Sequence, residues 1–456
     1  MEVRNGASIG TRTLTAALTA LAVTAALAGC NGHAQSFVPT APAGGAAAFY
    51  DPAAQLPTPI RHVVIIFQEN RTADYMFQDV PGADVTKSAI DSRGEPVRLH
   101  EVSLATTYDL GHYHRDFVAD YNGGRMNGFD SRLPDGKRAL PYGYGIPSEI
   151  RPYHDMAVQY VAADHMFQTN QGPSYPAHLY IVSGTATEPQ IRNYRVEDNP
   201  FQAVTRKWRA GGCASAPDVL VSTIDVHTGS AGPDVYPCFD RPVLSDFLDR
   251  QHVSWRYYQQ QSQNGLWHAL NSIRHVRFGP GFSNVISPPQ TILSDVAAGR
   301  LAGVSWVMPD NVHSDHASNR SAAGPSWVAA VVNAIGRSKY WNSTAIFITW
   351  DDWGGWYDHV KPPIDNAYEL GFRVPLIVVS PYAKRGYVSK NRHEFGSILA
   401  FAEVTFGIPK GALNSTDVRA DDLRDTFNFA QSPRTFVPIK APPFQPGPAS
   451  DRSEDP

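Results

Sequence analysis

The apolar residues of this chain are concentrated in short continuous runs. Five runs rich in Val, Ile, Phe, Trp and Leu lie at residues 62–67, 253–258, 304–308, 344–349 and 374–380. Runs of this length are typical of β-strands buried on both faces of a parallel sheet. Helix-like stretches separate them, such as 327–338 and 394–406. The pattern therefore predicts an α/β fold with a mostly parallel central sheet and helices on both faces.

Polar side chains follow three of these runs at the point where each predicted strand ends. Glu69 and Asn70 follow the first run, and His316 lies in the segment after the third. Asp351 and Asp352 come soon after the fourth run. Sheets of this kind bind ligands at the carboxyl ends of their strands. We therefore expect these five side chains to meet at one edge of the sheet.

The adjacent carboxylates of Asp351 and Asp352 suggest a bound cation. Two carboxylates at close range repel each other, and they stay ionised together mainly when a cation or strong donors lie between them. Oxygen ligands from this pair, Glu69 and Asn70 suit a hard divalent cation, whereas an imidazole ligand would favour zinc or another transition metal. A Glu-Asn pair after a strand can also be a turn or a helix cap, so each motif alone leaves a structural role open.

Ser174 lies in the segment 171–180, where a turn becomes an apolar, helix-like stretch. As an N-cap, its hydroxyl would accept a backbone N–H. As a nucleophile beside a metal, it would lose its proton more easily, and the helix N-terminus would stabilise an anion nearby. A phosphoryl group suits the second role, with an imidazole toward the leaving oxygen.

Three further histidines lie near these motifs. His112 and His114 precede the glycine-containing segment 121–129, and they could serve the site or be exposed loop residues. His359 follows Asp358 and could orient the aspartate pair without contacting the metal.

The N-terminus has the features of a lipoprotein signal peptide. Arg4 and Arg12 precede an Ala- and Leu-rich run at 14–28, which is short for a membrane span. Small residues then lead to Cys30, whose lipidation would anchor an exported chain to a membrane. The alternative is an ordinary secretory signal with an incidental cysteine.

Composition divides the chain into four parts. They are a signal peptide at 1–30, a flexible Ala/Pro/Gly linker at 31–58, a catalytic domain at 59–432 and a Pro-rich tail at 433–456, which we expect to be loosely packed. In an exported chain the two remaining cysteines, Cys213 and Cys238, can form a disulfide, although two free thiols are the alternative. The formal net charge is −4 and there is no basic run, so we expect no nucleic-acid partner.

Six motifs occur in order along the chain. They are Glu69-Asn70-Arg71-Thr72, the run at 122–129, Gly172-Pro173-Ser174-Tyr175-Pro176, Ser314-Asp315-His316, and the runs at 351–359 and 371–381. Together they resemble the bacterial phosphoesterase family, which contains phospholipases C and an acid phosphatase. The resemblance covers residues 59–429 and implies an alkaline-phosphatase-like fold.

The resemblance also implies roles for individual residues. Its metal ligands correspond to Glu69, Asn70, Asp351 and Asp352, and its hydroxyl nucleophile corresponds to Ser174. The phosphate-contacting histidines correspond to His112 and His316. A further histidine of the family has two candidates here, His268 and His275. The family's Ser-Asp-His-Pro continues with Ala317 in this chain, a departure that weakens the substrate assignment more than the chemistry.

These observations predict a metal-dependent phosphoric ester hydrolase with a phospho-Ser174 intermediate, acting on phosphomonoesters or on phospholipids. Acid phosphatase and phospholipase C activities both remain open, and Trp353 and Trp356 could form a cage for a choline cation. One alternative is a non-catalytic surface lipoprotein that binds a phosphorylated ligand. Another is a metal ion that only stabilises the fold.

Overall fold

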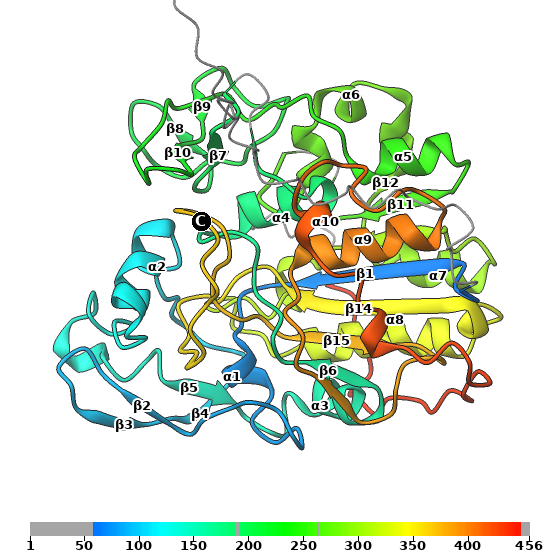
Figure 1. The fold of residues 1–456 in the computed structure, drawn as a ribbon, viewed down its shortest axis with the longest axis horizontal. Helices are drawn as coiled ribbons and strands as arrows, with labels where there is room; N and C mark the ends of the chain where they lie inside the picture. Colours follow the sequence, from blue (N-terminus) through cyan, green and yellow to red (C-terminus); the bar gives the residue numbers. More distant parts are fainter. Residues whose placement is uncertain (1–57, 188–190, 262–263, 448–456) are drawn as a thin grey trace, which may run out of the picture. The chain divides into compact units, whose positions relative to one another are not determined.

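An eight-stranded mixed sheet lies at the centre of the structure (Figure 1), a computed structural model that describes residues 58–187, 191–261 and 264–447. The described residues all belong to one compact unit. The expected signal peptide with Cys30, and the linker up to residue 57, lie outside the described residues.

Five neighbouring strands of the sheet are parallel, so the mostly parallel arrangement is confirmed. The strands lie in the order β12 (Val285–Ile286), β11 (Trp255–Tyr258), β13 (Val304–Val307), β1 (His62–Gln68), β14 (Thr344–Trp350), β15 (Leu376–Val379), β6 (Val161–Ala163) and β16 (Tyr387–Ser389). The five apolar runs predicted as strands all contain one.

The strand β15 is antiparallel to both of its neighbours, β14 and β6. Its start, and not its end, therefore lies at the edge where the parallel strands end. The short strand β6 was missed, since Val161-Ala162-Ala163 is too brief to stand out as an apolar run. Two successive reversals make β6 parallel to β14, so its carboxyl end leads to the segment with Ser174 at the same edge.

The pairing of β1 with β14 brings together the two motifs richest in oxygen ligands. The strands are parallel, and Gln68 at the end of β1 pairs with Trp350 at the end of β14. Both strands are buried on both faces over nearly their whole length, which fixes their register through packing. Residues that follow β1 and β14 must therefore lie next to each other.

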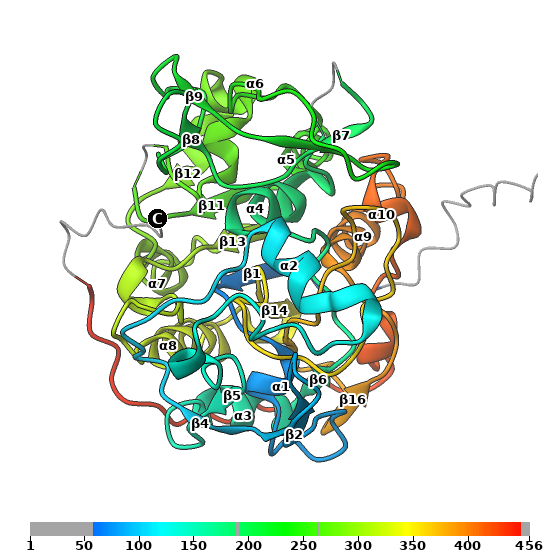
Figure 2. The same cartoon turned by 90° about the vertical axis from the view of Figure 1, so that its left-hand side faces the viewer.

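Helices cover both faces of the sheet (Figures 1 and 2). One face carries α3 (Arg151–Gln159), α7 (Thr291–Ala297) and α8 (Gly324–Gly336), and the other carries α4 (Ser174–Ser183), α5 (Leu244–Arg250) and α9 (Phe395–Thr405). The helices expected at 327–338 and 394–406 are found as α8 and α9. All ten residues of α4 are buried, which holds this helix firmly against the sheet.

Four helices and four two-stranded sheets complete the described structure. The helices are α1 (Ala73–Met76), α2 (His114–Tyr121), α6 (Arg274–Arg277) and α10 (Thr416–Arg419). The small sheets pair β2 (Ser88–Ile90) with β3 (Pro96–Arg98), β4 (His100–Val102) with β5 (Gly143–Gly145), β7 (Tyr194–Val196) with β10 (Thr223–Asp225), and β8 (Phe201–Gln202) with β9 (Val219–Leu220). Both views place β8 and β9 above α2, in a small lobe outside the central sheet.

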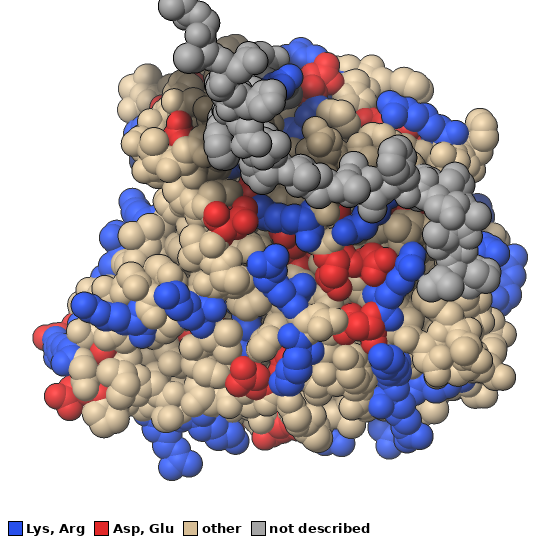
Figure 3. Space-filling view, viewed as in Figure 1, with Lys and Arg blue, Asp and Glu red and all other residues tan. Residues whose placement is uncertain are grey.

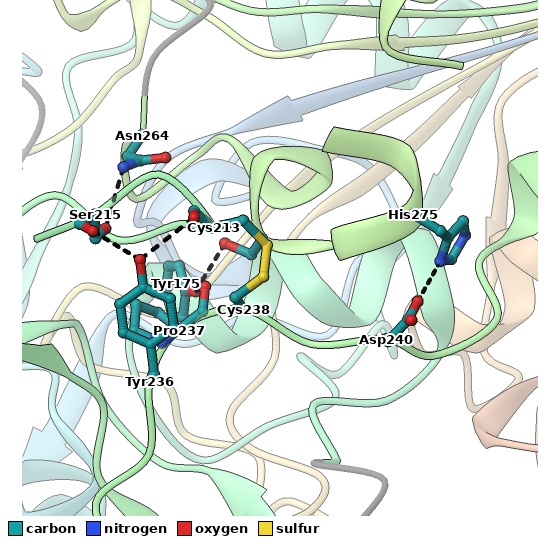
Figure 4. Close-up of a disulfide and its surroundings, with 10 residues drawn as sticks. Tyr175, Cys213, Ser215, Tyr236, Pro237, Cys238, Asp240, Asn264 and His275 are labelled. Carbon is teal, nitrogen blue, oxygen red and sulfur yellow. Dashed lines mark hydrogen bonds and ion pairs between the residues drawn. A yellow bond between two sulfur atoms is a disulfide. The ribbon is translucent and has the colours of Figure 1, made fainter. Parts of the chain in front are cut away.

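The predicted disulfide between Cys213 and Cys238 is present, with the two Cα atoms 4.4 Å apart. In the chain-entropy description, closing a loop with a sequence separation of 25 stabilises the fold by about 3.5 kcal/mol. Figure 4 shows Tyr175, the neighbour of Ser174, beside this disulfide. Its hydroxyl lies 2.8 Å from Oγ of Ser272 and 3.5 Å from the carbonyl oxygen of Pro237. The disulfide-closed loop therefore contributes to the surroundings of the first turn of α4.

The first part of the Pro-rich tail is packed against the domain, which corrects the expectation of loose packing for residues 433–447. Asn333 of α8 donates from Nδ2 to the carbonyl oxygen of Ile439 (2.9 Å), and its Oδ1 accepts the N–H of the same residue (2.8 Å). The ring of Phe444 lies 5.2 Å from that of Trp327 and 4.9 Å from that of His313, between ring centroids. The composition of the tail did not predict this packing, because a few apolar side chains are enough to hold an otherwise polar segment against the domain.

Charged side chains of both signs are interspersed on the described surface that Figure 3 shows. Beneath this surface, Arg419 pairs with two buried carboxylates, those of Glu369 (2.9 Å) and Glu394 (2.8 Å). None of the described helices combines the length and apolar character needed to cross a membrane.

Candidate active site

The four predicted metal ligands meet where β1 and β14 end. The backbone N–H of Asn70 donates to Oδ1 of Asp351 (3.0 Å), and Nδ2 of Asn70 lies 3.4 Å from Oδ2 of Asp352. Glu69 is close enough to Asp351 for one ligand atom of each to share an ion. All four side chains are fully buried. The convergence follows from the strand register, which places the residues after Gln68 beside those after Trp350.

A tight turn lets both aspartates face the same place. The N–H of Asp352 donates to Oδ1 of Asp351 (2.8 Å), and the N–H of Gly354 donates to Oδ1 of Asp352 (2.7 Å). Gly354 has a φ of 61°, and a Cβ at this position would lie 2.6 Å from the carbonyl oxygen of Asn70. Only glycine fits such a close approach in the left-handed region. The strand alternation therefore ends before Asp351, and the turn aligns both carboxylates.

Ser174 is the first residue of α4, and its hydroxyl faces the carboxylates. Its Oγ donates to Oε2 of Glu69 (3.1 Å) and lies 3.5 Å from Oδ2 of Asp352. Pro173 takes the N-cap position. The N-cap alternative for Ser174 is therefore wrong, because its side chain contacts the predicted ligands and does not cap the helix.

His178 belongs to the cluster and was missed in the sequence. Its Nε2 lies 3.0 Å from Oε1 of Glu69 and 4.0 Å from Oδ2 of Asp351. Burial lowers the pKa of His178 to about 3, so the imidazole is neutral. The available signal was its spacing of four from Ser174, which puts both side chains on one face of α4.

The electrostatics of the cluster fit a divalent cation. Burial raises the pKa of Glu69 well above its usual value, and repulsion from Asp351 raises it further. The same two causes, in the same order, raise the pKa of Asp352. Oδ2 of Asp351 and Oδ1 of Asn70 are buried without a hydrogen-bond partner among the described residues. Three carboxylates and an amide oxygen are a donor set that a hard divalent cation would satisfy, since it offsets their repulsion.

His112 and His316 lie on the side of Asp352. Nδ1 of His112 donates to the carbonyl oxygen of Leu110 (2.8 Å), and in that tautomer Nε2 accepts from Nδ2 of Asn70 (3.3 Å). The ring centroids of His112 and His316 are 5.8 Å apart. Both rings are close enough to Asp352 to favour its ionised form. The structure thus brings both predicted histidines to the cluster.

Two other histidines considered in the sequence do not join the cluster. Nδ1 of His114 donates to the carbonyl oxygen of Gln171 (2.8 Å) at the start of α2. His359 was expected to orient the aspartate pair, and this is wrong. Its Nδ1 lies 2.8 Å from Oδ2 of Asp74, and its Nε2 lies 3.2 Å from Oδ1 of Asp84. It joins a separate, partly buried network, because the chain turns away after the paired glycines.

The two candidates for the further family histidine differ in burial. His268 is buried, and it is near enough to His178 to contribute to the lowered pKa of that residue. His275 is exposed and lies between two carboxylates, 2.7 Å from Asp240 (Figure 4) and 3.0 Å from Asp246. The structure therefore places His268, and not His275, near the cluster.

Trp353 and Trp356 do not form a choline cage, because both are fully buried. Nε1 of Trp353 donates to Oδ2 of Asp120 (2.9 Å). The ring of Trp356 already has a cation over it, with Cζ of Arg71 5.3 Å from its centroid. These tryptophans pack the loop that carries the aspartates.

Comparison with known proteins identifies the family of this chain. Residues 60–409 match the model of the phosphoesterase family. The chain belongs to this family. Phosphoesterases hydrolyse phosphoester bonds, and the present member is accordingly a hydrolase.

Named relatives of this phosphoesterase are phospholipases C. "Phospholipase C A" of Mycobacterium tuberculosis is 26% identical over 85% of this chain and 81% of its own length. "Hemolytic phospholipase C" of Pseudomonas aeruginosa is 25% identical over 87% of this chain, which spans 59% of that protein. Among solved structures, lipoteichoic acid synthase LtaP from Listeria monocytogenes has a TM-score of 0.40 at 10% identity, covering 79% of this chain and 76% of its own. A protein in the alkaline phosphatase superfamily from Vibrio parahaemolyticus has a TM-score of 0.39 at 11% identity, covering 80% and 71%.

Proposed function

We propose that this phosphoesterase cleaves phospholipid phosphodiesters or soluble phosphate esters by transferring the phosphoryl group first to Ser174 and then to water. The observation that carries the proposal is the position of the Ser174 hydroxyl. Its Oγ lies within 3.1 Å of Glu69 and 3.5 Å of Asp352, inside a buried group of oxygen ligands. A nucleophilic serine needs a position of this kind, whereas a serine with a purely structural role does not.

Glu69, Asn70, Asp351 and Asp352 are the residues that would hold a divalent cation. When bound, the cation would supply positive charge for the phosphoryl oxygens and for an ionised serine oxygen. The hydrogen bond from Ser174 to Glu69 orients Oγ before attack. The burial of all these groups excludes bulk water, which strengthens each electrostatic contact.

The chemistry then proceeds in two displacements. Oγ of Ser174 loses its proton and forms a bond to phosphorus, while the bond from phosphorus to the leaving oxygen breaks and that oxygen takes up a proton. Water attacks the phosphoserine in the second displacement, which releases the phosphate product and returns a proton to Oγ. His112 and His316 lie on the side of Asp352, where an imidazole can hydrogen-bond a phosphoryl oxygen or move the proton of the leaving group.

The relatives support a choice of substrate class. The named proteins of similar sequence are phospholipases C, which supports phospholipid as the first substrate class to examine. A soluble phosphate monoester is the second class, since the cluster itself would contact only the phosphoryl group.

Chelation is expected to lower turnover by at least ~100-fold, because the charge that stabilises the transition state contributes several kcal/mol. The experiment measures hydrolysis of a phospholipid and of a chromogenic phosphate monoester before chelation, after it, and after addition of single divalent metals. Asp351→Asn should mimic chelation, whereas Asp365→Asn, at an exposed carboxylate, should not.

The alternatives predict different results in the same experiment. A non-catalytic binder would take up phosphate without turnover in any metal. A metal that only stabilises the fold would lower the melting temperature on removal in a protein that never hydrolyses an ester. Full activity after complete chelation would contradict the proposal.

We also propose that the enzyme is exported and held at a membrane through lipidated Cys30. The support is the signal-like sequence before Cys30 and the disulfide, which is typical of oxidising compartments. Cys30→Ser should move the enzyme from the membrane fraction to the soluble fraction of cells. An unchanged distribution would contradict the anchor.

A further inference from the structure

A cavity lies beside the proposed phosphoryl site. The side chains of Ser174, His112 and His316 are at most 4% exposed, so the remainder of any substrate must extend away from them. Next to them lies a cavity of about 260 Å³. Its lining includes Tyr113 and Arg115 from the start of α2, and Phe201, Arg206 and Trp208 from the small lobe around β8.

Short contacts connect this cavity to the site. Tyr113 follows His112 directly in the chain. Asn199, which also lines the cavity, accepts the N–H of Tyr175 at Oδ1 (3.1 Å), one residue from the nucleophile. Asp198 accepts the N–H of His114 (3.4 Å). The cavity therefore lies where a group attached to the phosphoryl centre would extend.

The hydrogen-bond donors of the cavity include two guanidinium groups and the indole N–H of Trp208. Cζ of Arg115 lies 5.2 Å from the ring centroid of Tyr113, and Cζ of Arg206 lies 3.6 Å from that of Phe201. Nε1 of Trp208 is buried and has no hydrogen-bond partner among the described residues. Two aromatic faces that could bind a quaternary ammonium thus already carry the chain's own guanidinium groups.

Acidic groups also lie near these donors. Arg206 pairs with Asp234 (2.7 Å), and Nε of Arg115 lies 3.9 Å from Asp116. Asp198 is the carboxylate in the lining, and burial raises its pKa to about 6. A guanidinium retains further N–H groups after one such contact, so both arginines can still bind a carboxylate or a phosphate.

Resting on the proposed function, we propose that this cavity binds a second anionic group of the substrate, a carboxylate or phosphate on the alcohol esterified to the phosphoryl group. The cavity disfavours a quaternary ammonium in the same position. The enzyme would then select anionic phosphate esters over choline esters. The source of such a group is either a lipid head group or a soluble metabolite.

Binding to the Ser174→Ala protein tests the cavity without requiring turnover. Calorimetry should show 3-phosphoglycerate binding at least ~10-fold more tightly than glycerol 3-phosphate, which lacks the carboxylate, and more tightly than phosphocholine. In the Ser174→Ala protein, a second substitution, Arg206→Gln or Arg115→Gln, should reduce the preference for 3-phosphoglycerate by ~10-fold. Arg151→Gln, at an exposed arginine that also pairs with an aspartate, is the matched control and should preserve it.

A lipid experiment distinguishes the two sources. Binding of the same variants to vesicles of phosphatidylserine and of phosphatidylcholine is measured. A preference for phosphatidylserine that disappears with Arg206→Gln assigns the cavity to lipid head groups. A preference seen only with the soluble esters assigns it to metabolites. Equal affinity for the three soluble ligands, no binding of any of them, or a preference that survives both arginine variants would overturn the proposal. If the wild-type protein hydrolyses no ester, the proposed function fails. The calorimetry still shows whether the cavity binds an anionic group.

Discussion

Replacing Ser174 by Ala is expected to reduce phosphoester turnover by at least ~10³-fold while the protein stays folded. The hydroxyl is the nucleophile of the proposed reaction, and no described neighbour can take its position in the first turn of α4. The loss in folding stability should be only about 1 kcal/mol, because one buried hydrogen bond to Glu69 is removed without adding volume.

The matched control lies at the other end of the same helix. Ser183 is also buried, and its Oγ donates to the carbonyl oxygens of Leu179 and Thr185 (2.7 Å each). Ser183→Ala should therefore keep wild-type turnover. Acid quenching of the wild-type reaction, followed by mass spectrometry, should locate phosphate on the peptide that contains Ser174. Turnover by Ser174→Ala within tenfold of wild type (about 1.4 kcal/mol) would exclude the phosphoserine route.

Replacing Arg373 by Met is expected to lower the free energy of unfolding by ~3–5 kcal/mol, the largest effect on stability that we predict. Arg373 is fully buried, and its guanidinium contacts both oxygens of Asp358 (2.9 and 3.1 Å) and Oδ1 of Asp74 (3.4 Å). It also donates to the carbonyl oxygens of Asp84 and Asp164, each at 2.9 Å. Methionine fills a similar volume but leaves two buried carboxylates without their cation.

This network joins the two loops that carry the proposed metal ligands. Asp74 lies four residues after Asn70, and Asp358 lies six residues after Asp352. Arg373→Met should therefore lower activity as well as stability. Urea unfolding followed by circular dichroism measures the stability change. Arg300→Met, at an exposed arginine paired with Asp295, should cost less than about 1 kcal/mol. An Arg373→Met protein as stable as the Arg300 variant would contradict the proposed role of the network.

The strand ends could be predicted because local sequence encodes them. The runs that form β1 and β14 are apolar without interruption, and the residues that follow them are polar. From that pattern alone Glu69, Asn70, Asp351 and Asp352 were expected at one edge, and the register of the two strands brings them there. His178 escaped notice because a buried histidine on an apolar helix looks the same in the sequence whether it packs or contacts a carboxylate.

The direction of β15 and the environments of the tryptophans could not be predicted in this way. An apolar run has the same appearance in a parallel and in an antiparallel strand, so the reversal at β15 depends on how the connections cross the sheet. Trp353 and Trp356 follow the ligands in the chain, yet they point into the core, because the turn at Gly354 directs only the carboxylates to the site.

The sequence by itself determined the class of fold, the disulfide partners and the residues at the ends of β1 and β14, because each depends on neighbouring residues or on a small choice of partners. The tertiary structure alone decided which groups face each other across long separations. It placed Arg373 between Asp74 and Asp358, His359 away from the proposed metal ligands, and the small lobe with Arg206 beside Arg115 at the start of α2. Such contacts arise when segments distant in the sequence pack together, and no local sequence pattern encodes the free energy of that packing.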